Sequence, residues 1–298
     1  MRYHHRWFIL FALALLAAAL PPPAASASLP PPPSRAIALT PDGKTLLVVN
    51  PDSNSLTLVD AATQTLLAEL PTGRDPRTVA AAAGRAYVAN RGSRTLSIVD
   101  IDLRETMAEI DVGYRPYGVV ADPVRGRVYI SVQGENRIAV VDTATNAVIG
   151  SRKVPALPSG LALGPGGDTL YVTHLLSGLV TVLPTELVQV YLPLIFRESP
   201  GDALAHGGQA LVSEELASAL LVPIPLFADS NLAQAIVLGP DGSRAYVPHT
   251  RSNTSNRALT FDTTVFPLVS LLDTASNQHL LGQQLDLATL DPPGVGLP

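Results

Sequence analysis

Two histidines and three arginines are the side chains of this sequence whose types and spacing could do chemistry. His174 and His249 end short apolar segments with the same pattern, TLYVTH and RAYVPH. Imidazole can ligate a metal ion or transfer a proton near neutral pH. Arg77, Arg115 and Arg251 could bind a carboxylate or phosphate through two parallel hydrogen bonds. These five residues are therefore candidates for a ligand site.

Each candidate also has a structural interpretation. Arginines in such positions often bridge neighbouring elements, and only four histidines follow residue 27: His174, His206, His249 and His279. So few histidines do not predict a multi-histidine copper site. We expect no metal site and no cofactor in this chain.

No catalytic residue is predicted. Ser218 and Ser270 lack the GxSxG setting of a hydrolase nucleophile. The GPGG of 164–167 has the pattern of a turn between strands, whereas a phosphate loop opens a helix. The chain contains no cysteine, which excludes a thioether-linked haem and zinc–cysteine sites.

The first 27 residues have the pattern of a secretory signal peptide. Arg2 and Arg6 are basic, Trp7–Leu20 is continuously apolar, and Ala25-Ser26-Ala27 matches a small-residue cleavage site. The apolar run of 14 residues is shorter than the roughly 20 that a membrane-spanning helix needs. We therefore expect a secreted, periplasmic or cell-surface protein without a transmembrane anchor after cleavage.

Residues 28–33 are proline-rich and predict an extended linker before the folded part of the chain. The formal net charge is −5, and charged residues make up 15% of the sequence. Nucleic-acid binding depends on many Lys and Arg side chains against phosphates, so a nucleic-acid partner is not expected.

A pattern of about 40 residues repeats along the chain. Its copies contain a short turn, an apolar strand that ends in Asn or His in four copies, and a second apolar strand that ends in Asp in four copies. The five copies begin at Ile37, Val79, Gly118, Gly160 and Ala235.

The repeat predicts four short antiparallel strands in each copy. Its first turn is TPDGK at 40–44, where Gly43 takes the left-handed position of a tight hairpin. The strands are rich in Val, Ile, Leu and Tyr. The recurring aspartates Asp60, Asp100, Asp142 and Asp273 are each interpreted as turn residues. Four strands per repeat are typical of the blades of a β-propeller, so we predict an all-β fold over 34–298.

The segments AYVAN, LYVTH, PDG and VVDTATNAVI resemble the YVTN-type β-propeller repeats of surface-layer and periplasmic proteins. The resemblance extends over most of 34–287. It implies an exported propeller whose loops bind a protein or a cell-envelope ligand.

The fifth copy is interrupted by 14 additional residues. Asn90 to Asp100 is 10 positions in the second copy, whereas His249 to Asp273 is 24 in the fifth. The segment PHTRSNTSNRALTFDTTVFP at 248–267 resembles a subgroup of propellers that precede a cytochrome c peroxidase-like haem domain. That resemblance implies a haem protein as an alternative partner, although this chain has no CxxCH motif.

Two further departures concern the blade count. Residues 186–231 fit the repeat poorly and are either an insertion between the third and fourth strands of blade four or a degenerate extra blade. In the first case LLVPIPL at 220–226 is the displaced outer strand. Helix is expected only at 204–219. Five recognisable blades predict either an unusually small propeller or an incomplete ring continued by further repeats.

The loops between blades and those between second and third strands should emerge on one face of the propeller. The long loop of 250–267 belongs to that face, which we predict to carry the binding site. The candidate binding residues on it are Arg77, Arg115, Tyr117, His174, His249, Arg251, Arg257, Phe261 and Asp262.

The function expected from these features is that of an exported, non-enzymatic binding scaffold. Two alternatives remain open at this point. One is a redox accessory that partners a haem protein, and the other is a hydrolase similar to propeller lactonases.

Overall fold

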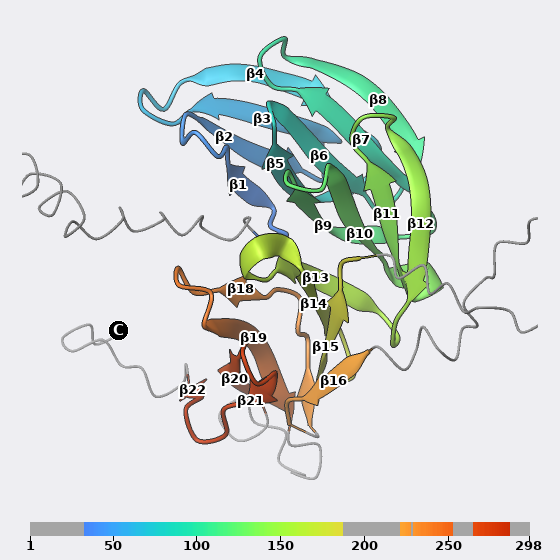
Figure 1. Ribbon diagram of the computed structural model, residues 1–298. Coiled ribbons are helices and arrows are strands. Elements are labelled where there is room, and N and C mark those ends of the chain that lie inside the picture. The colour runs from blue at the N-terminus through green and yellow to red at the C-terminus, as the bar shows by residue number, and fades with distance from the viewer. Residues whose placement is uncertain (1–32, 187–220, 228, 253–264, 287–298) are drawn as a thin grey trace, which may run out of the picture.

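A computed structural model describes residues 33–186, 221–227, 229–252 and 265–286. They form five antiparallel sheets that follow one another around an arc (Figure 1). The all-β propeller architecture expected from the repeat is confirmed. Among the described residues the helical elements are two short 3-10 turns, η1 at Gln133–Glu135 and η2 at Pro165–Gly167.

The first three sheets each consist of four strands that are consecutive in the chain. Sheet one contains β1 (Ile37–Leu39), β2 (Thr45–Asn50), β3 (Ser55–Asp60) and β4 (Leu66–Pro71). Sheet two contains β5 (Pro76–Ala82), β6 (Arg85–Asn90), β7 (Thr95–Asp100) and β8 (Glu105–Asp111). Sheet three contains β9 (Pro116–Asp122), β10 (Arg127–Val132), β11 (Arg137–Asp142) and β12 (Ala147–Lys153).

Sheet four takes its outer strand from beyond a long segment of the chain. Its strands are β13 (Pro158–Leu163), β14 (Thr169–His174), β15 (Leu179–Pro184) and β16 (Val222–Pro225). Val180 pairs with Ile224 across β15 and β16. This pairing is the first of the two arrangements considered for 186–231, an insertion within blade four. The helix expected at 204–219 lies outside the described residues.

Sheet five keeps the four-strand plan in an interrupted form. The inner position is shared by β17 (Ser230–Asn231) and β18 (Val237–Leu238), and the outer one by β21 (Gln278–His279) and β22 (Leu285–Asp286). The long central strands are β19 (Arg244–Ser252) and β20 (Val265–Asp273). Residues 250–252 and 265–267, which the sequence pattern assigned to a loop, therefore belong to strands.

The turn chemistry of the repeat is confirmed. Five equivalent glycines have φ between 61° and 76°, which is the left-handed region where a side chain is strained: Gly43, Gly84, Gly126, Gly167 and Gly242. Asp60 accepts hydrogen bonds from the backbone N–H and the hydroxyl of Thr63, at 2.7 and 2.8 Å. Asp142 with Thr145 and Asp273 with Ser276 repeat this pattern. The recurring aspartates are turn residues.

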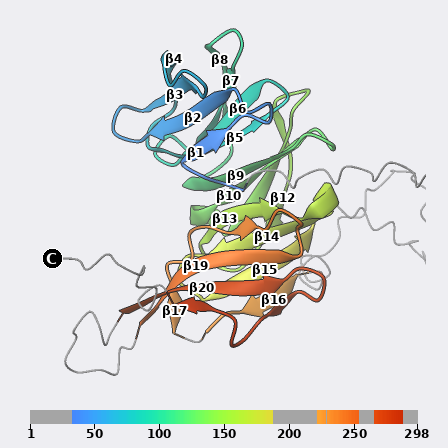
Figure 2. The same ribbon diagram turned by 90° about the vertical axis from the view of Figure 1, so that its left-hand side faces the viewer.

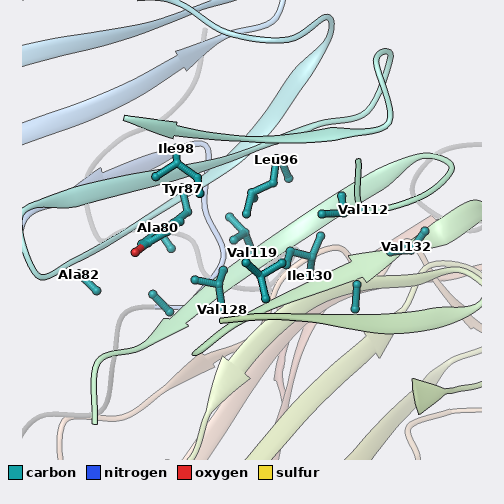
Figure 3. Packing of buried hydrophobic residues seen from close by; sticks show 14 residues of the cluster. Ala80, Ala82, Tyr87, Leu96, Ile98, Val112, Val119, Val128, Ile130 and Val132 are labelled. Atoms are coloured by element: carbon teal, nitrogen blue, oxygen red, sulfur yellow. The ribbon is translucent and has the colours of Figure 1, made fainter. Parts of the chain in front are cut away.

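Four apolar clusters hold neighbouring sheets together, one for each pair from sheets one and two to sheets four and five. Figure 3 shows the cluster between sheets two and three, where Tyr87, Leu96 and Ile98 face Val119, Val128 and Ile130. The three inner strands of sheets two and three are buried on both faces because a sheet packs on each side. The outer strands β8 and β12 are largely exposed.

The chain enters the fold through the axis of the arc. Ser34, which is 5% exposed, donates its N–H to the carbonyl of Leu161 at 2.9 Å and accepts the N–H of Leu161 on its hydroxyl at 2.8 Å. The carbonyl of Arg35 accepts the N–H of Val79 at 2.7 Å. Ser34 and Arg35, which we call the axial segment, therefore connect the inner strands of sheets two and four.

Candidate functional site

The inner strands of sheets two to five begin with the same backbone turn. One residue of this turn has a left-handed backbone in each sheet, with φ between 54° and 58°: Asp75, Arg115, Leu157 and Leu232. Two positions later come four residues that surround the axis at the loop end, Arg77, Tyr117, Ser159 and Gln234. We call these four residues the axial ring.

The axial ring joins sheets that are not neighbours. The hydroxyl of Tyr117 in sheet three donates to Oε1 of Gln234, which leads into sheet five, at 3.3 Å. The carbonyl of Tyr117 accepts the hydroxyl of Thr78 in sheet two at 2.5 Å. Ser159 accepts Nε2–H of Gln133 at 3.0 Å. Within the axial ring, the described bond across the axis is therefore the one between Tyr117 and Gln234.

Arg77 forms an ion pair within its own loop. Its Nη2 lies 2.7 Å from Oδ1 of Asp75, and Nη1 of Arg91 lies 3.6 Å from the other carboxylate oxygen. Both guanidinium groups are about one-third exposed, and the Nε atoms of both are buried without a hydrogen-bond partner among the described residues. Two arginines thus share one carboxylate at the loop end of the axis, which we call the mouth. These three side chains together carry a net positive charge.

Arg115 is fixed through its backbone. Its left-handed conformation is part of the shared turn, and its carbonyl accepts the N–H of Gln133 at 3.0 Å. Its side chain is partly buried. It lies in the same repeat position as Asp75, and it therefore adds a positive charge where sheet two carries a negative one.

His174 and His249 occupy a position that is polar in four of the sheets and bonds to a hydroxyl of the third strand. Asn50 donates to Thr57 at 2.7 Å, and Asn90 donates to Ser97 at 2.8 Å. Nε2 of His174 lies 2.8 Å from Oγ1 of Thr181, and Nε2 of His249 lies 2.9 Å from Oγ of Ser270. Both histidines are candidate binding residues by sequence, and in the structure each forms this bond between the second and third strands.

His174 is fully enclosed. Nδ1 lies 3.0 Å from the carbonyl of Ala156, which can only accept, so Nδ1 carries the proton and Nε2 accepts from Thr181. Burial lowers the pKa of His174 below its ordinary value. A neutral, 0% exposed imidazole with both nitrogens bonded cannot reach a ligand.

His249 has different surroundings, because a group of aromatic and charged side chains gathers beside it. The guanidinium of Arg251 lies over the ring of Phe227, 4.5 Å from its centroid. The His279 ring meets Phe227 edge-on at 5.1 Å, and the His249 ring lies 6.2 Å from it. Nε of Arg251 lies 2.8 Å from Oδ1 of Asp229. We call these five residues the sheet-five cluster.

The two histidines of the sheet-five cluster are held neutral. Burial lowers the pKa of His249, and the neighbouring His279 and Arg251 lower it further. Burial also lowers the pKa of His279. Arg251 is 39% exposed and remains accessible. The cluster thus offers one cation on an aromatic platform.

The sheet-five cluster lies at the base of the long insertion. The ladder between β19 and β20 continues three pairs beyond His249, through Thr250–Pro267, Arg251–Phe266 and Ser252–Val265. In sheet two the ladder stops at the equivalent pair, Asn90–Thr95. Three predicted binding residues, Arg257, Phe261 and Asp262, lie outside the described residues.

Sequence reasoning missed Gln234, Phe227, Asp229 and His279. Gln234 could have been found because it lies 12 positions before Tyr246 of the second strand, as Tyr117 does before Tyr129. The other three carry no local signal, because Phe227 and Asp229 follow the displaced strand β16 and His279 comes from β21. Only the packing of sheets four and five brings them together.

Other features of the described residues do not add a site. They contain no group of three or more His, Cys, Asp or Glu side chains arranged to hold a metal ion. No helix within them is long and apolar enough to cross a membrane. A cavity of about 20 Å³ lies between sheets three and four, beside Tyr129, Arg152 and Thr185, and has room for about one water molecule.

Comparison with known proteins finds similarity of structure. No family model matches the sequence, and no curated protein matches it. A structure of Kuenenia stuttgartiensis hydrazine synthase is similar over 90% of this chain and 69% of that one, with 23% identity and a TM-score of 0.66. A functionally unknown protein from Desulfotomaculum acetoxidans is similar over 83% and 84%, with 13% identity and a TM-score of 0.54. At these identities the likeness concerns the fold.

Proposed function

We propose that the protein is a non-enzymatic interaction scaffold that binds its partner on the face carrying the axial ring and the sheet-five cluster. The observation that carries this proposal is Arg251, which is held on Phe227 by stacking and oriented by Asp229 at the base of the long insertion. Stacking and pairing order this arginine before any partner arrives, so less entropy is lost on binding. An ordered, accessible arginine beside aromatic rings is typical of an interface hot spot.

Four arginines on this face favour a partner that presents carboxylates. Arg77, Arg91 and Arg115 surround the mouth, where one carboxylate, that of Asp75, lies between the first two. Arg251 has a single pairing with Asp229 and is 39% exposed. Guanidinium groups bind carboxylates with two parallel hydrogen bonds. We therefore expect an acidic protein surface or an acidic envelope polymer as the ligand.

The test is affinity capture from cell-envelope extract with matched variants. Shortening the segment between His249 and Asp273 to the 10-position spacing of Asn90–Asp100 should abolish capture while the far-ultraviolet circular dichroism keeps the β-sheet signal of the rest of the fold. Arg251→Glu should reduce capture at least tenfold. Lys44→Glu, on an 81% exposed side chain of the opposite face, is the control and should bind normally. Capture that survives both first variants would refute the proposal.

The proposed site of action is the cell exterior. The leader-like residues 1–27 and the proline-rich 28–33 support export and a short tether before the axial segment at Ser34. Fractionation of the source cells, with mass analysis of the mature chain, tests this. A chain that begins at Ser28 in the exported fraction is the expected result, and an intact chain in the cytoplasm would contradict it.

A second candidate is a redox accessory that partners a haem protein. The resemblance of 248–267 to propellers that precede haem domains supports it, whereas the structural likeness to hydrazine synthase supports the fold alone. If this candidate is right, the captured partner will show the Soret absorbance of a haem, and this absorbance will be missing from the capture with the shortened variant. Capture of a colourless partner would favour the scaffold without redox chemistry.

A further inference from the structure

Sheets two to five each pack one face against the preceding sheet, and we call this face the receiving face. In sheet two that face consists of Val79, Ala81, Ala86, Val88 and Val99, all buried against sheet one. The equivalent positions are buried in sheets three, four and five: Val119, Ala121, Val128, Ile130 and Val141; Leu161, Leu163, Leu170, Val172 and Leu183; Ile236, Leu238, Ala245, Val247 and Leu272. The receiving face is thus an apolar, five-residue feature of the repeat.

Sheet one has a receiving face that is not covered. Its five positions are Ile37, Leu39, Leu46, Val48 and Val59. Ile37 is 50% exposed and Leu39 is 46% exposed, while the other three are only partly buried. The strand β2 accordingly alternates between buried and partly buried residues, whereas β6 and β10 are buried from their second residue onward. No charged side chain occupies these five positions.

Sheet five has an uncovered apolar face on its opposite side. The opposite face of each sheet packs against the following sheet, and we call it the presenting face. In sheet two it contains five buried residues: Ala80, Tyr87, Ala89, Leu96 and Ile98. The corresponding positions in sheet five are Val237, Tyr246, Pro248, Val269 and Leu271, of which only Leu271 is buried. Leu285, opposite Val269 in the ladder, is 45% exposed on the same face. An apolar presenting face is therefore open at the other end of the arc.

Nothing among the described residues joins these two faces. The four apolar clusters connect sheets one to five in order, and none contains residues of both sheet one and sheet five. The views in Figures 1 and 2 place the two sheets at opposite ends of the series. Exposed apolar faces of this kind mark interaction surfaces.

We propose that the receiving face of sheet one binds the presenting face of sheet five of a second copy of this chain. The four internal interfaces show what covers a receiving face in this protein, which is the presenting face of a sheet with the same repeat. A second copy is an occupant that carries that face uncovered. The inference goes beyond the proposed function, since it concerns the flanks of the arc and not its loop face.

This contact is heterologous, since it joins two different surfaces. Repetition of a heterologous contact produces either a closed ring or an open chain of subunits. Two copies that make both contacts at once would form a closed pair. If each pair of copies makes only one contact, linear oligomers form, and they grow longer as the protein concentration rises.

The test is sedimentation velocity of the mature chain over a hundredfold concentration range. We expect a mass at or above that of a dimer at the upper end. Leu39→Lys on the receiving face and Leu285→Lys on the presenting face should each weaken association at least tenfold, by burying a charge. Leu103→Lys, on a 68% exposed turn residue away from both faces, is the control and should associate as the wild type does. Circular dichroism and thermal unfolding check that each variant folds.

Mixing the two face variants gives the sharpest result. The Leu39→Lys chain keeps an intact presenting face, and the Leu285→Lys chain keeps an intact receiving face. Their equimolar mixture should form a heterodimer with one contact and no larger species. A mixture that stays monomeric would refute the head-to-tail contact. A wild type that stays monomeric throughout, with little binding of an apolar dye, would show that a segment of the same chain covers the faces and would also refute it.

Discussion

His174 and His249 occupy the same position of the repeat, and their surroundings differ in a way that separates structure from function. His174 lies in a regular sheet with both nitrogens bonded and no exposed surface. His249 makes the same hydroxyl bond, but it adjoins Phe227, His279 and Arg251 at the base of an insertion. The repeat position alone therefore makes a structural bond. A candidate binding site arises where the repeat is interrupted.

The largest expected effect is on His174. His174→Ala should lower the free energy of unfolding by about 2–4 kcal/mol, because it opens a cavity and leaves the Thr181 hydroxyl and the Ala156 carbonyl unpaired. His249→Ala should cost about half as much, since its bond to Thr250 is long at 3.5 Å and one bond is lost. Urea unfolding followed by circular dichroism measures both.

The control for this comparison is His174→Asn. Asn90 makes the equivalent bond in sheet two, so the variant should recover most of the loss, to within about 1.5 kcal/mol of the wild type. A loss as large as that of His174→Ala would mean that the imidazole volume, and not the shared hydroxyl bond, stabilises this position.

The next effect concerns the axial segment, which contacts sheets two and four but forms no backbone bond to sheet five in the described residues. Ser34→Ala removes the hydroxyl that accepts the Leu161 N–H, and should cost about 1–2 kcal/mol as a buried donor loses its partner. Ser151→Ala, an exposed strand position, should change stability by less than about 0.5 kcal/mol. Thermal unfolding of the two variants distinguishes them, and equal stabilities would contradict a role for the axial segment.

The third effect is a pH dependence of stability. Burial lowers the pKa values of His174, His249 and His279 in the folded chain, so the unfolded chain binds more protons just below its ordinary histidine pKa of about 6.5. The stability that these neutral histidines contribute is complete above that pH and falls as the pH is lowered through it. The urea midpoint should be lower at pH 5.5 than at pH 7.5.

His174→Asn provides the check, because it should show a smaller loss between these two pH values. The turn aspartates do not interfere. Hydrogen bonds from Thr63 and Thr145 lower the pKa values of Asp60 and Asp142, so their contribution is lost only as the pH falls below the ordinary carboxyl range, near 3.9. An unchanged midpoint at pH 5.5 would contradict the neutral, buried state of the histidines.

The smallest expected effect on stability is that of the sheet-five ion pair. Arg251 and Asp229 are 39% and 35% exposed, and pairs that accessible contribute up to about 1 kcal/mol. Arg251→Ala and Asp229→Ala should each lower the free energy of unfolding by no more than that, and a double-mutant cycle measures their coupling. A cost above about 2 kcal/mol would make Arg251 a structural residue and would weaken the proposed function.

The regular part of the fold could be predicted because the residues that specify its strands and turns lie within each repeat. The left-handed glycines and the turn aspartates both act over a few positions. The glycines are confirmed in all five described sheets, and the aspartates in sheets one, two, three and five. The irregular part could not. Nothing local predicts that Val222–Pro225 pairs with β15, or that Phe227 comes to lie beside His279, since both depend on contacts between distant segments.

By itself the sequence determined the strands, the turns and the polar residue at the end of the second strand, because turn chemistry and strand propensity depend on neighbouring residues. Only the tertiary structure decided that His174 is enclosed, that Arg251 stacks on Phe227, and that sheets one and five each keep an apolar face open. Burial is a property of what packs against a residue from elsewhere in the chain. The same repeat therefore produces a covered face in sheet two and an uncovered one in sheet one.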